Sequence, residues 1–244
     1  MSSQRIILKF GGKSLATVEE IHKVKQIILE YTKKQCEIVV VVSAMGSTTD
    51  TLIHLAHQVA AVPDKRELDM LLSVGERISM TLLTMALLDA GADAVSFTGS
   101  QSTILTTNEF TDAKIVDIRP QRILEALSQK KIVVIAGFQG VSLEKEVTTL
   151  GRGGSDLTAV ALAAALEVDR VIFYKDVEGL YDKNPHLHEG ATLIERLNYV
   201  EAMQILKEER RPLIHLRALE WAEAHRVPLH IQTFQKNVGT IISF

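Results

Sequence analysis

Short aliphatic runs alternate with longer stretches of helical periodicity along most of this chain, and that alternation limits the folds open to it. The strongest run is 37–43, a nearly continuous series of β-branched residues typical of a strand buried on both faces. Further strands are predicted at 5–10, 94–98, 131–136, 170–175 and 229–233, and helices at 17–33, 49–62, 67–90, 121–129, 155–166, 199–207 and 214–224. The pattern predicts an α/β fold, a three-layer sandwich whose central, mostly parallel sheet carries helices on both faces.

The 244 residues show no internal repeat and no low-complexity linker, so we expect a single domain. Within it we expect an N-terminal lobe over about 1–140 and a C-terminal lobe over about 141–244. The segment 101–119 is polar and rich in threonine, and we expect it to form a hairpin or a lid.

Charge and composition argue against several classes of protein. A net charge of −3 and a pI of about 6.3 give no sign of a partner such as nucleic acid or an anionic membrane. No run reaches the roughly 18 apolar residues of a membrane span, and no secretory signal pattern is present. The single Cys36 excludes an intrachain disulfide and suits a reducing compartment, so we expect a cytoplasmic protein.

A glycine-rich turn precedes the predicted helix 155–166. It contains Gly151, Arg152, Gly153 and Gly154, followed at once by a Ser-Asp pair. Glycine lets the backbone approach a ligand, a helix N-terminus presents unpaired N–H groups, and arginine offers a forked cation. The turn therefore suits an anion, although an ordinary strand-to-helix turn with a Ser or Asp cap fits about equally well.

Polar or glycine residues follow five of the predicted strands, at 9–12, 43–50, 98–101, 137–140 and 176–179. The carboxyl ends of parallel strands meet at one edge of a sheet, which is where ligands bind in such folds. One polar strand end is usually only a turn, but five at the same rim favour a ligand cleft.

The residue types at this rim suit phosphoryl transfer, which needs cations and N–H donors around the moving group. Lys9 and Arg152 supply charge, and the glycines Gly11, Gly12, Gly153 and Gly154 supply N–H donors. Asp156 would orient Lys9, help to hold Mg²⁺ through water, or serve only as a helix cap.

Two acidic residues, Asp69 and Glu76, are seven apart in the predicted helix 67–90 and so share a face. Gly75 is expected to make this helix irregular and to admit a close neighbour. Glu76 could bind a substrate ammonium, but the residues alone favour an ordinary surface position. The pair His186 and His188 is interpreted as part of a surface loop, and no metal site is predicted.

Six motifs together resemble the catalytic domain of the aspartate kinases, within the amino-acid kinase superfamily. They are K-F-G-G-x-S (9–14), V-V-S-A-M-G-x-T-T-D (41–50), R-E-L-D-M-L-L-S-V-G-E-R-I-S (66–79), F-T-G-S-Q (97–101), A-G-F-Q-G-V (136–141) and T-T-L-G-R-G-G-S-D-x-T-A (148–159). Similar glutamate, carbamate and uridylate kinases share the fold and a Lys-Gly-Gly start but not this combination. The resemblance covers nearly the whole chain and implies the amino-acid kinase fold.

The resemblance implies an ATP- and Mg²⁺-dependent transfer of the γ-phosphoryl group to the β-carboxylate of L-aspartate, the first step toward lysine, threonine and methionine. It implies that Lys9 and Asp156 are catalytic, with Glu76 meeting the substrate ammonium and Arg152 a carboxylate. The aspartate pocket would comprise Ser43, Thr49, Glu76, Phe138, Arg152 and Ser155. The nucleotide site would comprise Gly11, Gly12, Gly153, Gly154, Lys175, Asp176 and Tyr181.

Three departures from the family pattern lie on the nucleotide side. Lys175 stands in place of a threonine, His186 in place of an arginine, and Pro212 in place of a lysine that reaches the phosphates. Besides an active aspartate kinase, two alternatives therefore remain. One is a related carboxylate kinase with altered substrate or nucleotide use, and the other is a non-catalytic subunit that binds aspartate.

Regulation and assembly are also implied only by the resemblance. The chain ends soon after 234–240, where the C-terminal ACT domains of aspartate kinases would begin, so we expect a catalytic domain without its own feedback domain. We expect a homodimer and allow for a separate regulatory chain.

Overall fold

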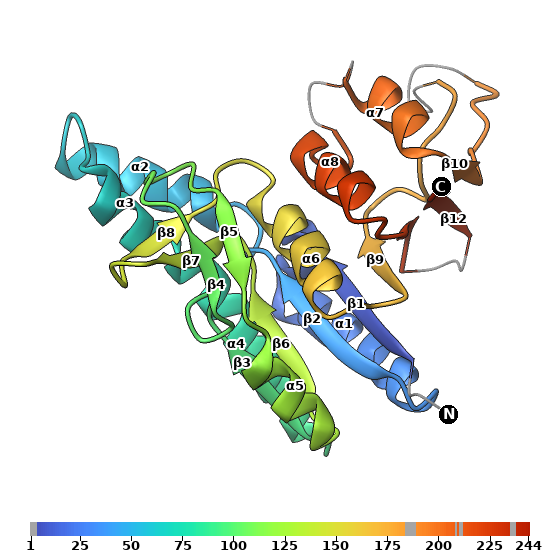
Figure 1. Cartoon of the computed structure of the whole chain (residues 1–244), viewed down its shortest axis with the longest axis horizontal. Helices are drawn as coiled ribbons and strands as arrows, with labels where there is room; N and C mark the ends of the chain where they lie inside the picture. The colour runs from blue at the N-terminus through green and yellow to red at the C-terminus, as the bar shows by residue number, and fades with distance from the viewer. Residues whose placement is uncertain (1–3, 184–188, 208, 210–211, 235–237) are drawn as a thin grey trace.

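The structure is a computed structural model that describes residues 4–183, 189–207, 209, 212–234 and 238–244. His186 and His188, predicted above to lie in a surface loop, fall outside the described residues. The described chain forms two sheets with helices packed against them (Figure 1).

The main sheet has eight strands in the order β10-β12-β11-β9-β1-β2-β6-β3. Its strands are β1 (Arg5–Phe10), β2 (Glu37–Val42), β3 (Ala94–Phe97), β6 (Ile132–Ala136), β9 (Arg170–Tyr174), β10 (Arg196–Leu197), β11 (Leu229–Gln232) and β12 (Gly239–Ile242). Among the described strands of this sheet, only the β11–β12 pair is antiparallel, so the predicted mostly parallel sheet is confirmed. The short strand β10, at one edge of the sheet, and its neighbour β12 were not predicted.

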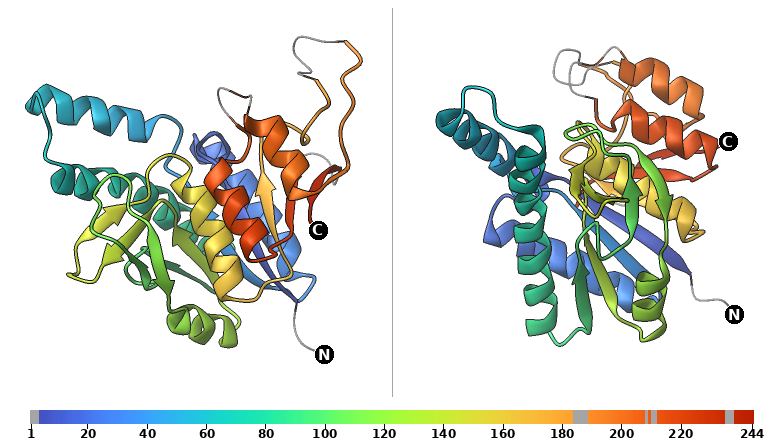
Figure 2. Two further views of the ribbon diagram at one scale, coloured as in Figure 1. Left: turned by 45° about the horizontal axis from the view of Figure 1, so that its top comes forward. Right: turned by 60° about the vertical axis from the view of Figure 1, so that its left-hand side comes forward.

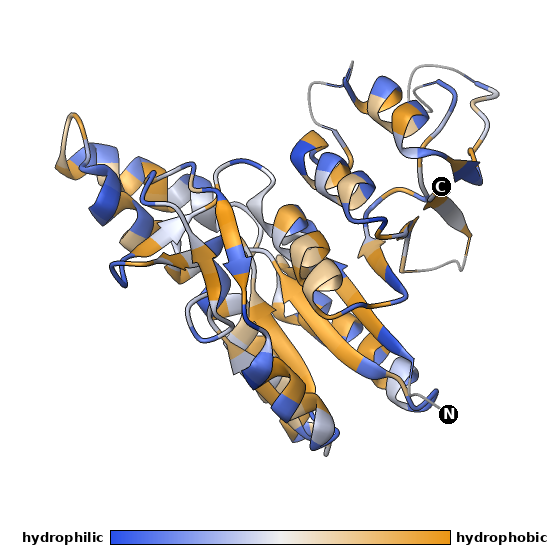
Figure 3. Ribbon diagram, in the orientation of Figure 1, coloured by the Kyte–Doolittle hydropathy of each residue, from blue (hydrophilic) through white to orange (hydrophobic). Residues whose placement is uncertain are grey.

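Successive residues of the central strands point to opposite faces of the main sheet and build two separate cores. On one face Leu8 and Val40 pack with α1 (Val18–Thr32) and α4 (Val74–Asp89). On the other face Val39 packs with helices including α5 (Gln121–Ser128), α6 (Gly154–Ala165), α7 (Tyr199–Lys207) and α8 (Leu216–Ala224). Figure 3 shows the resulting apolar strands β2 and β6, and the predicted three-layer arrangement is confirmed.

A second, four-stranded sheet has the order β5-β4-β7-β8. Its strands are β4 (Ile104–Thr106), β5 (Ile115–Ile118), β7 (Gln139–Ser142) and β8 (Val147–Thr149). The β4–β5 hairpin realises one of the two predictions for 101–119, whereas the β7–β8 hairpin was not foreseen. Near this sheet, α2 (Thr48–Val59) and α3 (Lys65–Leu72) project from the rest of the molecule (Figure 2).

The predicted helix 67–90 is interrupted, but at Ser73 and not at Gly75. Asp69 therefore lies on α3 and Glu76 on α4, so the two acidic residues do not belong to one uninterrupted helix as predicted. Gly75 does admit a close neighbour, because a Cβ there would lie 2.8 Å from the Ala44 Cβ.

The stretch Lys65–Asp89 is long and apolar enough to cross a membrane by length and composition alone. Half of its apolar window is buried inside the fold, as in the core helix of a globular protein. Asp69 and Glu76, within this stretch, are also buried. The stretch is therefore weak evidence for a membrane span.

The five strand ends that carry polar residues do meet. β3, β6, β2, β1 and β9 are consecutive and parallel in the main sheet, so their carboxyl ends share one rim. A short 3-10 helix, Gly12–Leu15, follows β1 at this rim, and the N-terminus of α6 carries the glycine-rich turn. The fold thus brings together the motifs near residues 9 and 156 that the sequence separates.

Candidate active site

A buried ion pair joins the first strand to helix α6. Lys9 Nζ lies 2.6 Å from Asp156 Oδ1, and both side chains are nearly inaccessible to solvent. Lys175, one residue beyond β9, approaches the other carboxylate oxygen, with Nζ 3.5 Å from Asp156 Oδ2. Asp156 therefore links two lysines, and it does so in addition to occupying the first turn of α6.

The electrostatics of this cluster follow from its burial. Burial alone would raise the pKa of Asp156, but the charges of Lys175 and Lys9 outweigh it and lower the pKa to about 2. The nearby backbone N–H of His215 also favours the ionised form of this carboxylate and so helps to lower its pKa. Burial lowers the pKa of Lys175 to about 8, because the opposite charge of Asp156 offsets the desolvation only in part.

The glycine-rich turn depends on glycine at two positions. Gly151 and Gly153 have φ angles of 70° and 71°, in the left-handed region that other residues rarely adopt. A Cβ on Gly153 would lie 2.2 Å from the Cβ of His215, so the turn also packs too closely for a side chain. The Gly154 N–H donates to Gly151 O at 3.0 Å, so it is paired within the turn, and its predicted contact with an anion stays a prediction.

Glu76 is only 4% exposed, so the surface position favoured by the residues alone is wrong. Its Oε1 accepts a hydrogen bond from the Ala44 N–H at 3.0 Å, and its Oε2 has no partner among the described residues. Burial raises the pKa of Glu76 to about 7, although the Ala44 N–H and the charge of Lys9 both favour the carboxylate. A buried carboxylate oxygen without a partner is costly, and a cationic ligand group would satisfy it.

Two serines connect this carboxylate to the glycine-rich turn. Ser43 Oγ and Ser155 Oγ lie 2.8 Å apart, at the end of β2 and in the first turn of α6. Ser79, one turn after Glu76 on α4, donates to Ser43 O at 2.7 Å. Helices α4 and α6 therefore meet at the end of β2, where the sequence predicted the substrate pocket.

Phe138 has a φ of 70°, which is unusual for a residue with a side chain. Thr158 Oγ1 accepts from its N–H at 3.0 Å, and its carbonyl accepts from the Leu150 N–H at 2.8 Å. Its ring lies so close to Gly154 that a Cβ there would be 2.9 Å from Phe138 Cδ2. The strained backbone is thus held from both sides, next to the N-terminus of α6.

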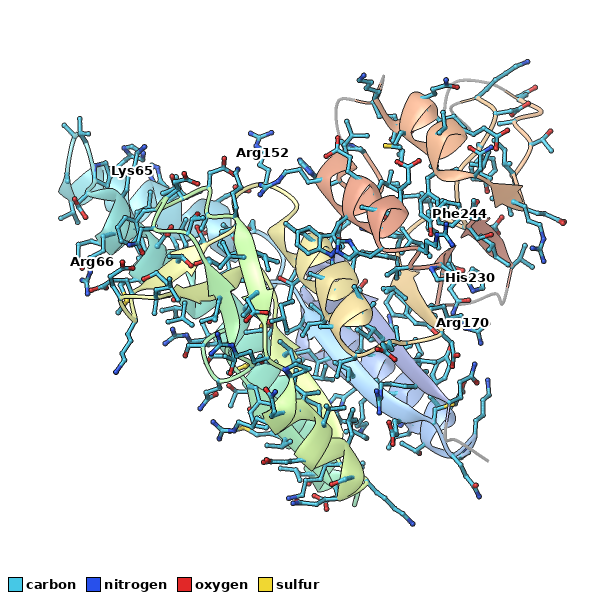
Figure 4. The ribbon with its side chains drawn as sticks, in the orientation of Figure 1. Lys65, Arg66, Arg152, Arg170, His230 and Phe244 are labelled. Carbon is cyan, nitrogen blue, oxygen red and sulfur yellow. The ribbon has the colours of Figure 1, made fainter. Side chains whose placement is uncertain are left out.

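Two further residues predicted for the same pocket, Arg152 and Thr49, are more accessible to solvent than Glu76. Arg152 is exposed, and it makes no hydrogen bond or ion pair within the part of the chain that the structure describes. Figure 4 shows its side chain extending outward from the loop that precedes α6. Thr49, in the first turn of α2, is half-buried.

On the nucleotide side, Asp176 pairs with Lys13, whose Nζ lies 2.6 Å from Asp176 Oδ2. That hydrogen bond holds the pKa of Asp176 below its usual value. Both residues line a groove of about 620 Å³ that also contacts Lys23, Ile27 and Phe234. Tyr181 is half-buried and donates from its hydroxyl to a Glu178 oxygen at 3.1 Å.

Sequence reasoning gave no role to three supporting residues. His215 was not singled out, because close packing on a glycine leaves no sequence signal. Ser79 falls in the motif 66–79 but was given no role. Asp69 is fully buried and accepts from the N–H groups of Thr111 and Thr149, thereby fixing the strand that leads into the glycine-rich turn.

Known proteins match this chain over nearly its whole length. The sequence profile of the amino acid kinase family matches residues 4–233. The aspartokinase of Corynebacterium glutamicum is 47% identical over 240 residues, which are 98% of this chain and 57% of the relative. An aspartate kinase structure from Synechocystis superposes with a TM-score of 0.85 at 38% identity, covering 98% of this chain and 39% of that chain.

A further solved structure shows likeness of fold alone. Aspartokinase III from E. coli, in complex with aspartate and ADP, superposes with a TM-score of 0.88 at 23% identity, covering 98% of this chain and 64% of that chain. The chain thus spans just over half the length of the curated relatives it matches. On its sequence profile and its fold, the chain belongs to the amino acid kinase family.

Proposed function

We propose that the protein is an aspartate kinase, which transfers the γ-phosphoryl group of ATP to the β-carboxylate of L-aspartate and yields 4-phospho-L-aspartate and ADP. One observation carries the proposal. The buried Lys9–Asp156 pair and the buried, half-satisfied Glu76 lie at the same rim, close enough for the Lys9 charge to affect the pKa of Glu76. A phosphate-binding cation and an ammonium-binding carboxylate are the two groups that this reaction needs.

The chemistry needs no general base. An oxygen of the substrate β-carboxylate forms the new bond to γ-phosphorus while the bond from γ-phosphorus to the β,γ-bridging oxygen breaks, and that oxygen leaves on ADP with the electron pair. Because the attacking carboxylate is already ionised at neutral pH, no proton is removed. The protein therefore contributes position and positive charge, with Lys9 facing the transferring group and Asp156 holding Lys9 in place.

In the aspartate pocket, Glu76 Oε2 would accept the substrate ammonium and so gain the partner that it lacks. The facing hydroxyls of Ser43 and Ser155 offer donors for a carboxylate. Arg152 is the cation free to swing onto a carboxylate, since no described residue holds it. Thr49 and Phe138 complete the pocket in the proposal, on the strength of the family resemblance.

On the nucleotide side, Gly11 lies beside the catalytic lysine, because a Cβ there would be 3.8 Å from Lys9 Nζ. We place the terminal phosphates next to Gly11 and Lys9, with the backbone of Gly12 and Gly153 nearby. Asp176 and Tyr181 would line the rest of the nucleotide site. GTP in place of ATP remains an alternative that the assay below separates.

Magnesium would arrive with the nucleotide. No group of three or more His, Cys, Asp or Glu side chains among the described residues is arranged to hold a metal ion. Both oxygens of Asp156 already face lysines. Mg²⁺ usually keeps several waters and binds through substrate phosphates, so the residues present fit an ion carried by ATP. When bound there, it would neutralise phosphate charge.

The setting of the enzyme is also part of the proposal. We infer a cytoplasmic protein whose residues 1–244 form a single catalytic domain with lobes that meet near residue 140.

We also infer a homodimer. The apolar residues Val74, Ile78, Leu82, Met85 and Leu88, spaced along one side of α4 and exposed, would suit such a contact. Sedimentation velocity of Ile78→Glu against the wild-type protein tests this inference.

The test of the proposed function is incubation with Mg²⁺, nucleotide and amino acid in the presence of hydroxylamine, which converts an acyl phosphate into a hydroxamate. L-Aspartate with ATP is expected to give hydroxamate. Activity only with another carboxylate, or only with GTP, would indicate the related kinase instead. Calorimetric binding of aspartate without nucleotide binding or turnover would indicate the non-catalytic subunit.

A further inference from the structure

The buried cluster at the rim holds more positive charge than its own carboxylate can balance. Lys9 and Lys175 share Asp156, and their side chains are 4% and 14% exposed. Of the other nearby carboxylates, Asp176 adds some compensating charge near Lys175 but is itself paired with Lys13, and Glu76 is assigned to the substrate ammonium. With aspartate bound, the two lysines therefore share Asp156 as their one directly paired carboxylate among the described residues.

Lys175 is the more weakly paired of the two lysines. Its Nζ is 3.5 Å from Asp156 Oδ2, whereas Lys9 Nζ is 2.6 Å from Oδ1. Its ammonium also lies over the face of Phe173, whose ring centre is 5.6 Å away and which gives modest support. Burial lowers the pKa of Lys175 to about 8, a sign that Asp156 only partly offsets its desolvation. An anionic ligand would complete the compensation.

The strand register places Lys175 where such an anion would lie. Phe10 pairs with Tyr174 in the β1–β9 ladder, so Lys175 is level with Gly11 on the neighbouring strand. Gly11 also lies beside Lys9, because a Cβ there would be 3.8 Å from Lys9 Nζ. Gly11 is therefore flanked by Lys9 and Lys175, at the ends of two neighbouring strands.

We propose that Lys175 is a catalytic residue that contacts the oxygens of the β-phosphate and of the transferring phosphoryl group, while Lys9 contacts the transferring group alone. This assignment rests on the proposed function for the identity of the phosphoryl donor. As the bond to the β,γ-bridging oxygen breaks, negative charge grows on the β-phosphate of ADP. Lys175 is the buried cation placed to stabilise that charge, and Asp156 keeps both lysines oriented.

Calorimetry of ADP and AMP binding separates this role from a structural one. Lys175→Met is expected to weaken ADP binding by roughly tenfold to a hundredfold, because a charge-assisted contact is lost, and to leave AMP binding unchanged. Lys175→Arg, which keeps the charge, is expected to retain part of the ADP affinity. The control Lys33→Met removes an exposed charge just after α1, far from the rim, and should match the wild-type protein.

Thermal unfolding and turnover complete the test. Lys175→Met should not lower the melting temperature, since it removes a buried charge that is only partly compensated. The kcat for phosphoryl transfer should fall by roughly a hundredfold or more. Equal losses of ADP and AMP affinity, unchanged ADP affinity, or a lower melting temperature with unchanged kcat would each overturn the proposal.

The same experiments distinguish this inference from the proposed function. Lys175-dependent ADP binding in a protein that makes no aspartyl phosphate would reject the aspartate kinase and leave the phosphate contact standing. Formation of aspartyl phosphate with ADP binding that ignores Lys175 would do the reverse. A wild-type protein that does not bind ADP at all would reject both.

Discussion

Lys9 Nζ lies 2.6 Å from Asp156 Oδ1, so an ion pair joins the end of the first strand to the N-terminus of α6. The two residues are far apart in the sequence, and their buried contact brings the lysine of the first motif next to the glycine-rich turn. Because water is largely excluded from this contact, Asp156 is the group that holds the Lys9 ammonium in position.

Replacement of Asp156 by asparagine is expected to lower kcat by roughly a hundredfold to a thousandfold, because Lys9 and Lys175 lose the charge that orients them. Steady-state kinetics with varied ATP and aspartate measures this. Asp117→Asn serves as the control, since Asp117 is exposed on β5 and pairs only with Arg119 among the described residues. Equal kinetics for Asp156→Asn and the wild-type protein would show that Asp156 is merely a cap.

The pH dependence of aspartate capture should report Glu76. Burial raises its pKa to about 7, so in the free protein the carboxylate becomes protonated as the pH falls through about 7 and can no longer pair with an ammonium. The value of kcat/KM for aspartate is expected to fall below about pH 7. Glu76→Gln should raise KM for aspartate strongly and remove this limb of the profile. An unchanged profile in Glu76→Gln would assign the limb to another group.

Arg152 should affect substrate capture without affecting stability. Its side chain is exposed and has no partner among the described residues, so Arg152→Gln removes no folded-state contact. We expect KM for aspartate to rise roughly tenfold to a hundredfold, since a charge-assisted contact to a carboxylate is lost, with an unchanged melting temperature. A loss of stability without a change in KM would place Arg152 outside the pocket.

The glycine-rich turn should tolerate no side chain at Gly153. Gly153→Ala combines a φ of 71° with a Cβ 2.2 Å from His215, and we expect a loss of about 3 kcal/mol in unfolding free energy. Gly91→Ala is the matched control, because Gly91 has a φ of 80° but nothing within 4 Å, so about 1 kcal/mol is expected. Denaturant unfolding measures both. Equal losses would mean that the contact with His215 relaxes without cost.

The central strands and the common rim could be predicted from the sequence because their residues are continuously aliphatic and their ends carry polar side chains. Strands β7 and β8 could not, since they are three or four residues long and largely polar, and their pairing with each other and with β4 defines them.

Within the site, Lys9 and Asp156 could be recognised from local sequence signals. A double glycine follows closely after Lys9, and Asp156 stands at the start of a predicted helix. Glu76 has no such signal, because a charged residue in a helix is usually exposed. Its burial depends on contact with Ala44, to which Gly75 allows close approach. The burial of Asp69 likewise depends on hydrogen bonds from the N–H groups of Thr111 and Thr149, which are distant in the sequence.

Mass spectrometry of the hydroxamate formed from ATP, Mg²⁺ and L-aspartate tests the central claim most directly, with Lys9→Met as the matched variant. The account predicts aspartyl hydroxamate from the wild-type protein, in amounts that follow ADP release, and none above background from Lys9→Met. Absence of the product at high concentrations of wild-type protein, or equal amounts from both proteins, would contradict it.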